Sequence, residues 1–560
     1  MKYCSKAFRT NRSAFVVLLL IVICVAAFGQ NEVPGIEYRI KPVPKADRTD
    51  LEISLGFKAE NTNPVTARLP VDCFGMPNIL YRYVTKFEGD AGTTVKPAEK
   101  ENERIIQPAK DGTVSLRYAI SYDPLEMEKH PYSPNTSPDH FHLGGCQWLL
   151  RIGDQDKKWK YSIKIVDPPR EWKFYSSISP AAAHIETVDT HRNLISSGIG
   201  GGKRSHFFQV KGRPVSVFVH GNLGIPDRDI FSAVEKIVRF QRDWFEDHSQ
   251  PFFAIAVSER AATRSGYAPS NAFFSFVKKD TTLEDLIRLM SHEMAHTWFN
   301  DRFFQREKDV SSLRYAWFTE GVNDYISRKI LLDAKLLTLD KFVESFNRDI
   351  IAIADNTHRA ATLDDLIQAS KAGKFGQVRT KLSYSRGALM ALAWEAQIRR
   401  SGKGRSLANL IKEASSIARN GGIKEGDLFK IAEKYGVDAM GDFEKYIVRG
   451  EPIRIFSDSF GRQYELREMP ATSFDPGFAL DESLDAGKVT GVRLDGPAYP
   501  AGLRDCMKIL NDENANRYGN SWDPNKQMAI IVEIDGKERR IEFFPHGNPH
   551  ELQVFQKSGK

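Results

Sequence analysis

The chain has 560 residues, of which 41% are hydrophobic and 11% aromatic, and its formal net charge is +7. This composition is too apolar and too aromatic for a disordered protein, and the length suffices for three or four folded domains. Residues 1–29 carry four basic and no acidic side chains, so removing them lowers the net charge from +7 to +3. A charge this small gives no electrostatic reason to expect nucleic-acid binding.

The first 29 residues have the layout of a secretory signal peptide. A basic head precedes an uninterrupted apolar run over residues 14–28, and the small residues Ala27 and Gly29 stand where a signal peptidase cleaves. The run is shorter than the ~20 apolar residues of a typical membrane span. We therefore expect a secreted or periplasmic protein. The alternative is an uncleaved N-terminal segment that anchors the chain to a membrane.

Residues 30–220 are predicted to form an N-terminal β-rich domain. Alternating or β-branched stretches are separated by Pro, Gly, Asn and Asp turns, and no long helical pattern interrupts them. The clearest predicted strands cover residues 50–57, 113–120 and 158–166.

Three cysteines follow the predicted signal peptide: Cys73, Cys146 and Cys506. The sequence contains no Cys-x-x-Cys pair, so its spacing excludes a thiolate zinc site. Export permits a disulfide, and Cys73 and Cys146 are the pair expected to share a domain. Three buried free thiols are an equally good interpretation.

From about residue 229 the hydrophobic pattern becomes helical, with apolar residues at three- and four-residue spacing. Two overlapping capping signals, Thr281 with Glu284 and Thr282 with Asp285, mark the start of one of these helices. We expect residues 221–455 to form a mixed domain with a helical extension. Its predicted helices cover residues 229–247, 281–299, 313–332, 363–369, 384–400 and 406–418.

Residues 462–548 are predicted to form a second β-rich unit. The strand signal returns after Pro452, and short apolar stretches alternate with glycine and proline. The segments that we assign to this unit cover residues 477–480, 488–494, 496–503 and 528–534.

The helix predicted over residues 281–299 contains the pentapeptide His292-Glu293-Met294-Ala295-His296. Residues four apart share one face of a helix, so both imidazoles can reach a single metal ion. Glu293 lies about 100° round the helix from His292, which suits a proton acceptor better than a ligand.

A catalytic zinc site with one open position needs a third protein ligand. Glu320 lies 24 residues after His296, among Trp317, Phe318 and Tyr325. A carboxylate in such apolar surroundings costs free energy unless it is paired or bound to metal, so we expect Glu320 to be this ligand.

Asp324 follows Glu320 by four residues and therefore shares its helix face. It is either the carboxylate that accepts the second N–H of a zinc-bound histidine, or an ordinary exposed helix carboxylate. The residues together predict one Zn²⁺ ion held by His292, His296 and Glu320.

These motifs resemble the gluzincin metallopeptidases. The pentapeptide, followed by Thr297-Trp298 and by Trp317-Phe318-Thr319-Glu320-Gly321, is most similar to the glycyl aminopeptidase family, and next to the membrane alanyl aminopeptidase family. The segment Tyr384-Ser385-Arg386-Gly387-Ala388 resembles the one in which these families place a tyrosine that stabilises the transition state. The resemblance thus implies a catalytic base at Glu293 and an oxyanion donor at Tyr384.

The resemblance extends to the C-terminal unit. Gly477-Phe478 and the segment 496–503 are similar to a PDZ domain, which the glycyl aminopeptidase family carries in this place. It implies a multidomain α+β chain: a β-rich N-terminal domain, a thermolysin-like mixed and helical catalytic domain over 221–455, and a PDZ-like domain over 462–548. A C-terminal peptide is the implied PDZ ligand.

One departure from the family pattern concerns substrate binding. Family members that remove N-terminal residues have a Gly-x-Glu segment whose glutamate holds the substrate amine. This chain has Gly266-Tyr267-Ala268, so the anchoring carboxylate is missing while the zinc motif is intact. Gly266, Tyr267 and Ala268 remain the candidate substrate-binding segment.

Other signals are weaker. His140 and His142 can face one way from a strand, with His130 nearby, but no further ligand completes a second metal site. Phe273, Phe274 and Phe276 are interpreted as an inward-facing strand.

The sequence therefore predicts an exported zinc peptidase acting on peptides or proteins. One alternative is a catalytically degenerate peptide-binding protein that uses its PDZ-like domain. The other is a zinc hydrolase of a non-peptide ester or epoxide.

Overall fold

The computed structural model describes residues 33–559, apart from residues 74–75, 78–79, 122–133, 261–264, 301, 306–309, 357, 373–376, 403 and 512–524. The predicted signal peptide lies outside the described residues. Within these ranges, no helix is both long and apolar enough to cross a membrane. The chain forms two compact units: the first ends at Ser205 and includes Arg260, and the second contains His206–Glu259 and the chain after residue 264.

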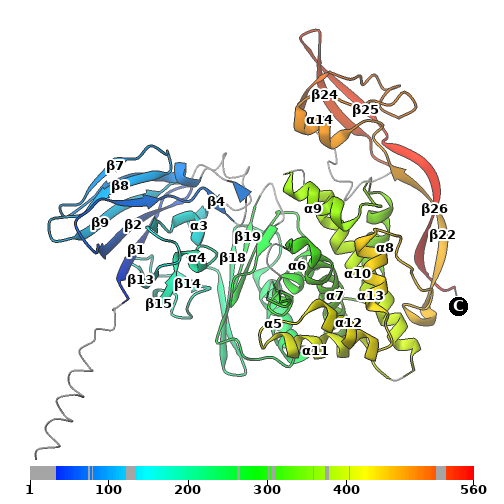
Figure 1. Cartoon of the computed structure of the whole chain (residues 1–560), viewed down its shortest axis with the longest axis horizontal. Helices are drawn as coiled ribbons and strands as arrows, with labels where there is room; N and C mark the ends of the chain where they lie inside the picture. Colours follow the sequence, from blue (N-terminus) through cyan, green and yellow to red (C-terminus); the bar gives the residue numbers. More distant parts are fainter. Residues whose placement is uncertain are drawn as a thin grey trace, which may run out of the picture. The chain divides into compact units, whose positions relative to one another are not determined.

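The first unit is β-rich, as predicted (Figure 1). In one sheet the strand order is β15-β13-β1-β2-β9-β6, and two further sheets have the orders β10-β11-β16-β14 and β12-β3-β8-β7. Burial alternates along β2, so that one face packs into a hydrophobic core. The strands of these sheets are β1 (Gly35–Pro44), β2 (Thr49–Lys58), β3 (Val65–Arg68), β6 (Val84–Gly89), β7 (Thr94–Pro97), β8 (Glu103–Gln107), β9 (Thr113–Ile120), β10 (Asn135–Ser137), β11 (His140–Gly144), β12 (Arg151–Ile152), β13 (Lys158–Ile165), β14 (Lys173–Ser176), β15 (His184–Thr190) and β16 (Gly198–Gly202).

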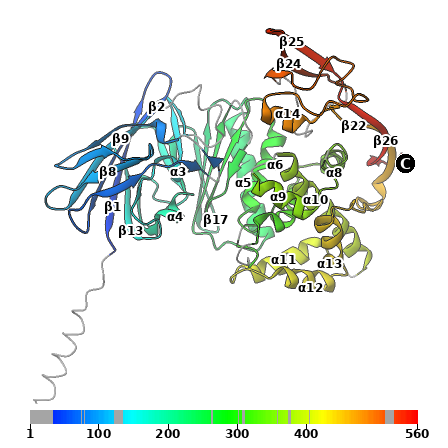
Figure 2. The ribbon, with the colours of Figure 1, turned by 45° about the horizontal axis from the view of Figure 1, so that its top comes forward.

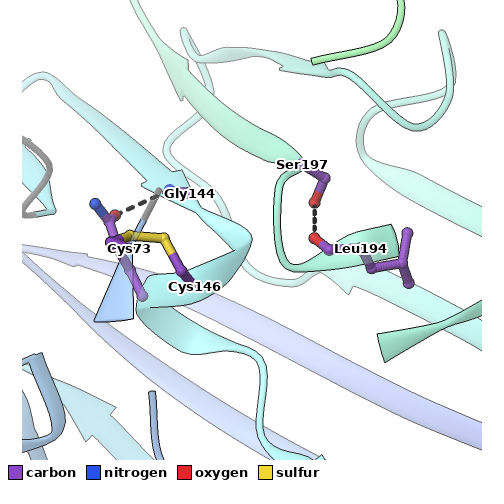
Figure 3. Close-up of a disulfide and its surroundings, with 6 residues drawn as sticks. Cys73, Gly144, Cys146, Leu194 and Ser197 are labelled. Carbon is purple, nitrogen blue, oxygen red and sulfur yellow. Dashed lines mark hydrogen bonds between the residues drawn. A yellow bond between two sulfur atoms is a disulfide. The ribbon is translucent and has the colours of Figure 1, made fainter. Parts of the chain in front are cut away.

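A disulfide joins Cys73 to Cys146, with 5.4 Å between their Cα atoms (Figure 3). Cys73 ends the two-residue strand β4 (Asp72–Cys73), and Cys146 lies in the short helix α3 (Gly145–Trp148). The backbone N–H of Gly144 donates to the Gln147 side chain at 2.9 Å, which fixes the start of α3. The interpretation as three buried free thiols is therefore wrong, and Cys506 is exposed.

The second unit begins with a sheet in the order β17-β18-β19-β21-β20. Strands β18, β19 and β21 are parallel, whereas β20 pairs antiparallel with β21 and forms the edge. The first two strands lie before residue 220, so the N-terminal β-rich segment predicted to end there supplies strands to both units. The strands are β17 (Ser205–Val210), β18 (Arg213–His220), β19 (Phe253–Glu259), β20 (Ser265–Tyr267) and β21 (Ala272–Val277).

Helices make up most of the second unit after this sheet, as the periodicity predicts. Helices α11, α12 and α13 gather on one side of α10 (Figure 2). The segment predicted as one helix over 313–332 is a 3-10 turn, a π-helical segment η3 (Trp317–Val322) and then α7 (Asn323–Asp333). The other helical elements are α5 (Asp227–Trp244), α6 (Leu283–Ala295), α8 (Leu339–Ala354), α9 (Leu363–Lys371), α10 (Gln377–Arg400), α11 (Leu407–Ala418), α12 (Glu425–Lys434), α13 (Ala439–Asp442) and the π-helical η4 (Phe443–Val448).

The C-terminal elements have a hydrophobic core of their own, which contains Val489, Leu503 and Ile530. The two-stranded antiparallel sheet of β22 and β26 packs on α8, where Asn347 and the backbone of Phe555 exchange two hydrogen bonds of 2.9 Å. The elements are β22 (Tyr464–Phe474), α14 (Leu480–Ala486), β23 (Lys508–Asn511), β24 (Met528–Ile534), β25 (Lys537–Phe543) and β26 (His546–Lys557).

The strand assignments at residues 477–480, 488–494 and 496–503 are wrong, because none of these segments is a strand in the structure. Helix α14 begins at Leu480, and it ends at Gly487, whose φ of 63° is the left-handed conformation that stops a helix. The hydroxyl of Ser483 donates to the Ala479 carbonyl at 2.6 Å and accepts from the Thr490 N–H at 2.9 Å. The segment after α14 is thus held against the helix, and it contacts the chain at the start of β23 through an isolated bridge between Lys488 and Lys508 and through backbone hydrogen bonds of Val489 with Cys506 and Met507.

Candidate metal centre

Helix α6 presents both motif histidines on one face. It begins after Thr282, whose hydroxyl accepts from the Asp285 N–H at 3.1 Å; this is the second of the two capping signals. Leu286, Met290 and Met294 are buried at four-residue spacing and hold the other face against the core. The imidazole rings of His292 and His296 lie 4.8 Å apart, centroid to centroid.

Glu320 completes a three-residue cluster from the neighbouring π-helical segment η3. Its Oε2 lies 3.3 Å from His292 Nε2 and 3.5 Å from His296 Nε2. One potential ligand atom from each of the three residues lies within 4.8 Å of the other two. Among the described residues, this is the group of His, Cys, Asp and Glu side chains with the geometry to hold a metal ion.

The ligand atoms of this three-residue cluster are of the kind that binds a divalent cation. Glu320 Oε2 is buried and accepts no hydrogen bond from the residues that the structure describes, although a buried carboxylate oxygen normally accepts one. Both Nε2 atoms face this oxygen, so a cation between them would satisfy all three donors. Two imidazoles and one carboxylate form a donor set that zinc takes in catalytic sites.

A hydrogen bond from Nδ1 orients the imidazole ring of each histidine. His292 Nδ1 donates to Asp324 Oδ1 at 2.8 Å, and His296 Nδ1 donates to the Phe299 carbonyl at 3.0 Å. This pattern fixes both rings with Nε2 available as a ligand, as is usual for metal-bound histidines. Asp324 therefore contacts His292 and is not an exposed helix carboxylate.

The contacts of Asp324 continue into a buried ion-pair chain. Its Oδ2 accepts from Arg328 at 2.9 Å, and Arg328 also donates to Asp349 on α8. Asp349 accepts in turn from the Ser385 hydroxyl at 3.1 Å. Ser385 adjoins Tyr384 on α10, so this chain links the helix of His292 to the helix of the candidate oxyanion donor.

Glu293 lies beside the three-residue cluster, close to the edge strand β20. Burial raises the pKa of its carboxyl group, an effect that the two neighbouring histidines partly offset. A Cβ on Gly266 would lie 3.2 Å from Glu293 Oε1. A glycine at this position therefore provides the space in which the Glu293 carboxyl group lies. A carboxylate placed in this way can accept a proton from an attacking water molecule.

Tyr384 also lies beside the cluster, on α10. Its ring stacks on that of His292 with 5.8 Å between centroids. Burial, and then the neighbouring Glu320 carboxylate, holds the pKa of the Tyr384 phenol well above its usual value. The hydroxyl therefore keeps its proton and can serve as a hydrogen-bond donor.

The substrate-binding candidates lie along β20 and just after it. Tyr267 packs against Phe274 and Phe276 of β21, with ring centroids 5.1 and 6.4 Å apart. Every residue of β21 is buried, as expected for the Phe273–Phe276 stretch. Ala268 is exposed and follows β20 directly.

The histidines His140 and His142 do not join a metal-ligand cluster of three within the described residues. His140 Nδ1 pairs with Asp139 at 2.9 Å, and His142 Nδ1 contacts the Tyr175 hydroxyl at 2.8 Å. His130 lies outside the described residues.

Sequence reasoning missed Arg328 and Asp349. Arg328 follows Asp324 by four residues, so helix periodicity could have shown that the two side chains share a face. Asp349 comes from α8 and carries no motif that would have marked it.

Comparison with known proteins finds a similar fold among solved structures but no match by sequence. The sequence matches no protein-family model and no curated protein sequence. The structure is similar to the crystal structure of an aminopeptidase N family protein from Idiomarina loihiensis, with a TM-score of 0.66 and 15% identity over 93% of this chain and 98% of that one. An M1 zinc metallopeptidase from Deinococcus radiodurans gives a TM-score of 0.42 and 13% identity over 76% and 96%. The chain therefore has the fold of the Idiomarina protein, and the second likeness is too partial to add to it.

Proposed function

We propose that this chain is a zinc-dependent peptidase of the gluzincin type, similar to the glycyl aminopeptidase family. The main support for the proposal is that potential ligand atoms of His292, His296 and Glu320 lie within 4.8 Å of one another, and that the buried Glu320 Oε2 accepts no hydrogen bond from the described part of the chain. The fold shared with the Idiomarina protein supports it.

In the proposed mechanism, His292, His296 and Glu320 hold one Zn²⁺ ion. When bound, zinc supplies Lewis acidity at the scissile carbonyl. Glu293 accepts the proton of the attacking water and passes it to the leaving amine. Tyr384 donates its phenolic hydrogen to the developing oxyanion, and Asp324 keeps His292 in the tautomer that leaves Nε2 free.

The decisive experiment compares Glu293→Gln with the wild-type chain. We expect peptide hydrolysis to fall by roughly 10²- to 10⁴-fold while the zinc content stays at one ion per chain. Glu284→Gln is the matched control, because Glu284 lies in the first turn of the same helix and pairs with Arg288. Undiminished turnover in Glu293→Gln would reject the mechanism.

The proposal covers peptide and protein substrates, with both exo- and endopeptidase action open. Ala268 stands where the resembling aminopeptidases have the glutamate that holds a substrate amine, so a free amino terminus loses its anchor. We expect blocked and free peptides to be cleaved at similar rates. A mixed library with free and acetylated amino termini measures this directly.

We further propose export, with a cleaved signal peptide over residues 1–29. The disulfide between Cys73 and Cys146 supports an oxidising compartment. Residues 462–548 are proposed to be the PDZ-like domain, which the separate hydrophobic core of the C-terminal elements supports.

A non-catalytic peptide-binding protein is the second candidate, because Ala268 replaces an expected functional residue. Stoichiometric zinc together with peptide turnover would exclude it. A substrate panel that includes esters and epoxides separates the peptidase from a hydrolase of non-peptide substrates.

A further inference from the structure

A cavity of about 810 Å³ lies in the second unit, and its lining does not include His292, His296 or Glu320. Helices α8 and α10, the chain after η4, and the two-stranded sheet of β22 and β26 surround it. Its volume lies within the range of small-molecule sites, roughly 300–1,000 Å³. Much of the lining is apolar, and the main contributors are Ile350, Ile353, Leu389, Ile453, Phe474 and Leu552.

One charged residue of this lining is almost completely buried. Arg386 is 3% exposed, and its guanidinium donates to the carbonyls of Ala361 at 2.8 Å and Arg359 at 2.7 Å. No carboxylate among the described residues forms an ion pair with it. Burial lowers the pKa of Arg386 to about 10, which reflects the cost of a cation without a counter-ion.

The other charges around the cavity leave this cation uncompensated. The lining carboxylates each have an arginine partner: Asp475 pairs with Arg493, and Glu451 pairs with Arg449 at 2.7 Å. His550 lies beside the carboxylate of Asp355. Arg359 adds a second lining guanidinium that has no ion pair within the described part of the chain.

We propose that this cavity binds a carboxylate carried on an apolar body, with Arg386 holding the carboxylate. A guanidinium has five N–H donors in a fork that matches a carboxylate, and the two carbonyl contacts leave three of them. The apolar lining accommodates the rest of the ligand. Either a fatty acid or the C-terminal end of an apolar peptide supplies this chemistry.

This binding site is independent of the proposed peptidase chemistry. Tyr384 and Arg386 are two residues apart on α10, so their side chains leave the helix about 200° apart. Ligand binding at Arg386 should therefore be the same in zinc-loaded and zinc-free protein. Failure of the peptidase proposal leaves this prediction unchanged.

The first test varies the ligand, with the Glu293→Gln chain as the host so that peptides are not hydrolysed. Calorimetry compares dodecanoate, acetyl-Leu-Leu-Leu with a free carboxylate, and the same peptide as its amide. We expect at least one carboxylate to bind and the amide to bind roughly tenfold more weakly or worse. Binding of dodecanoate alone identifies a lipid source, and binding of the peptide acid identifies a peptide source. Absence of binding by both carboxylates, or equal binding of acid and amide, overturns the proposal.

The second test varies the protein. Arg386→Met should weaken binding of the carboxylate by roughly tenfold or more, whereas Arg386→Lys keeps the charge and should retain most of it. Arg399→Met is the matched control. Arg399 lies on the same helix as Arg386 and also donates to two backbone carbonyls, but it does not line the cavity. If Arg386→Met does not fold, Ile353→Glu places a negative charge in the intact cavity and should abolish binding. Unchanged binding in either variant overturns the proposal.

Discussion

The backbones of Gly321 and Gly387 touch. A Cβ on Gly321 would lie 2.5 Å from the Cα of Gly387, and a Cβ on Gly387 would lie 1.9 Å from the Trp317 carbonyl oxygen. Gly321 follows the candidate ligand Glu320, and Gly387 lies one helical turn after Tyr384. The two glycines therefore let η3 and α10 approach each other without an intervening side chain. This close approach brings Tyr384 beside the cluster of His292, His296 and Glu320.

We predict that Gly387→Ala lowers both stability and activity. The new methyl group must push η3 and α10 apart, at a cost of roughly 1–3 kcal/mol, and it moves Tyr384 away from Glu320. Urea unfolding and peptide turnover measure the two effects. Gly426→Ala is the control: Gly426 lies in α12 with open space around it, so alanine should stabilise the helix by up to about 1 kcal/mol. A Gly387→Ala chain as active as wild type would contradict the proposed role of this contact.

Tyr384→Phe should reduce kcat by roughly 10²- to 10³-fold, because it removes one donor to the oxyanion. Zinc content and KM should change little, since the aromatic ring that stacks on His292 remains. Tyr435→Phe removes a phenol that donates to Glu413 elsewhere in the unit and should leave kcat unchanged. Retention of full kcat in Tyr384→Phe would show that the phenol makes no contact in the transition state.

Asp324→Asn should weaken zinc binding by roughly 10- to 100-fold, the usual effect of removing the carboxylate behind a ligand histidine. The affinity is measured by competition with a chromogenic chelator. Asp333→Asn, which removes a carboxylate paired with Lys329 on the same helix, should leave zinc affinity unchanged. Equal affinities of all three chains would contradict the orienting role of Asp324.

Asp355 should make stability depend on pH. Burial raises the pKa of Asp355 to about 6, against roughly 3.9 in an unfolded chain. Between these two values the folded state binds more protons, so the contribution of Asp355 to the free energy of unfolding falls as the pH rises through about 6 and becomes constant about one pH unit higher. Asp355→Asn should thus be more stable than wild type by up to roughly 3 kcal/mol at pH 7.5 and equal to it near pH 3.5. If the stability difference between Asp355→Asn and wild type were the same at both pH values, the raised pKa of Asp355 would be contradicted.

Ala268→Glu should shift the substrate preference toward peptides with a free amino terminus. The new carboxylate follows β20, whose Gly266 lies next to Glu293, and it offers an ion pair to a protonated amine. The ratio of kcat/KM for free and acetylated peptides measures the shift, and Ala268→Gln controls for side-chain size. An unchanged ratio would show that the amine does not bind at this position.

Much of the fold was accessible from hydrophobic periodicity. Strand β9 has the predicted limits, and β13 differs by one residue, because both alternate buried and exposed side chains. Periodicity does not say which sheet a strand joins, so β17 and β18 were grouped with the wrong neighbours. At α14 the short apolar segments were interpreted as strands, although acidic residues at 481 and 482 and a glycine at 487 are typical of the first turn and of the stop of a helix.

The candidate metal centre was predictable to a different degree for each residue. The two histidines and Glu293 follow from helical spacing alone, whereas Glu320 lies in a π-helical segment that no sequence rule used above indicates. Pairing of Asp324 with His292, and of Arg328 with Asp349, depends on three helices that meet only in the folded chain. The placement of Tyr384 depends on the glycine contact between η3 and α10.

The bond between Cys73 and Cys146 joins positions 73 residues apart, and its consequence is practical. Closing a loop of this length lowers the entropy of the unfolded chain by an amount equivalent to roughly 4 kcal/mol of stability. Recombinant chain made in a reducing bacterial cytoplasm lacks this contribution, so its first unit should be more susceptible to proteolysis. Production in an oxidising host compartment is therefore the appropriate route to material for zinc analysis and enzymology.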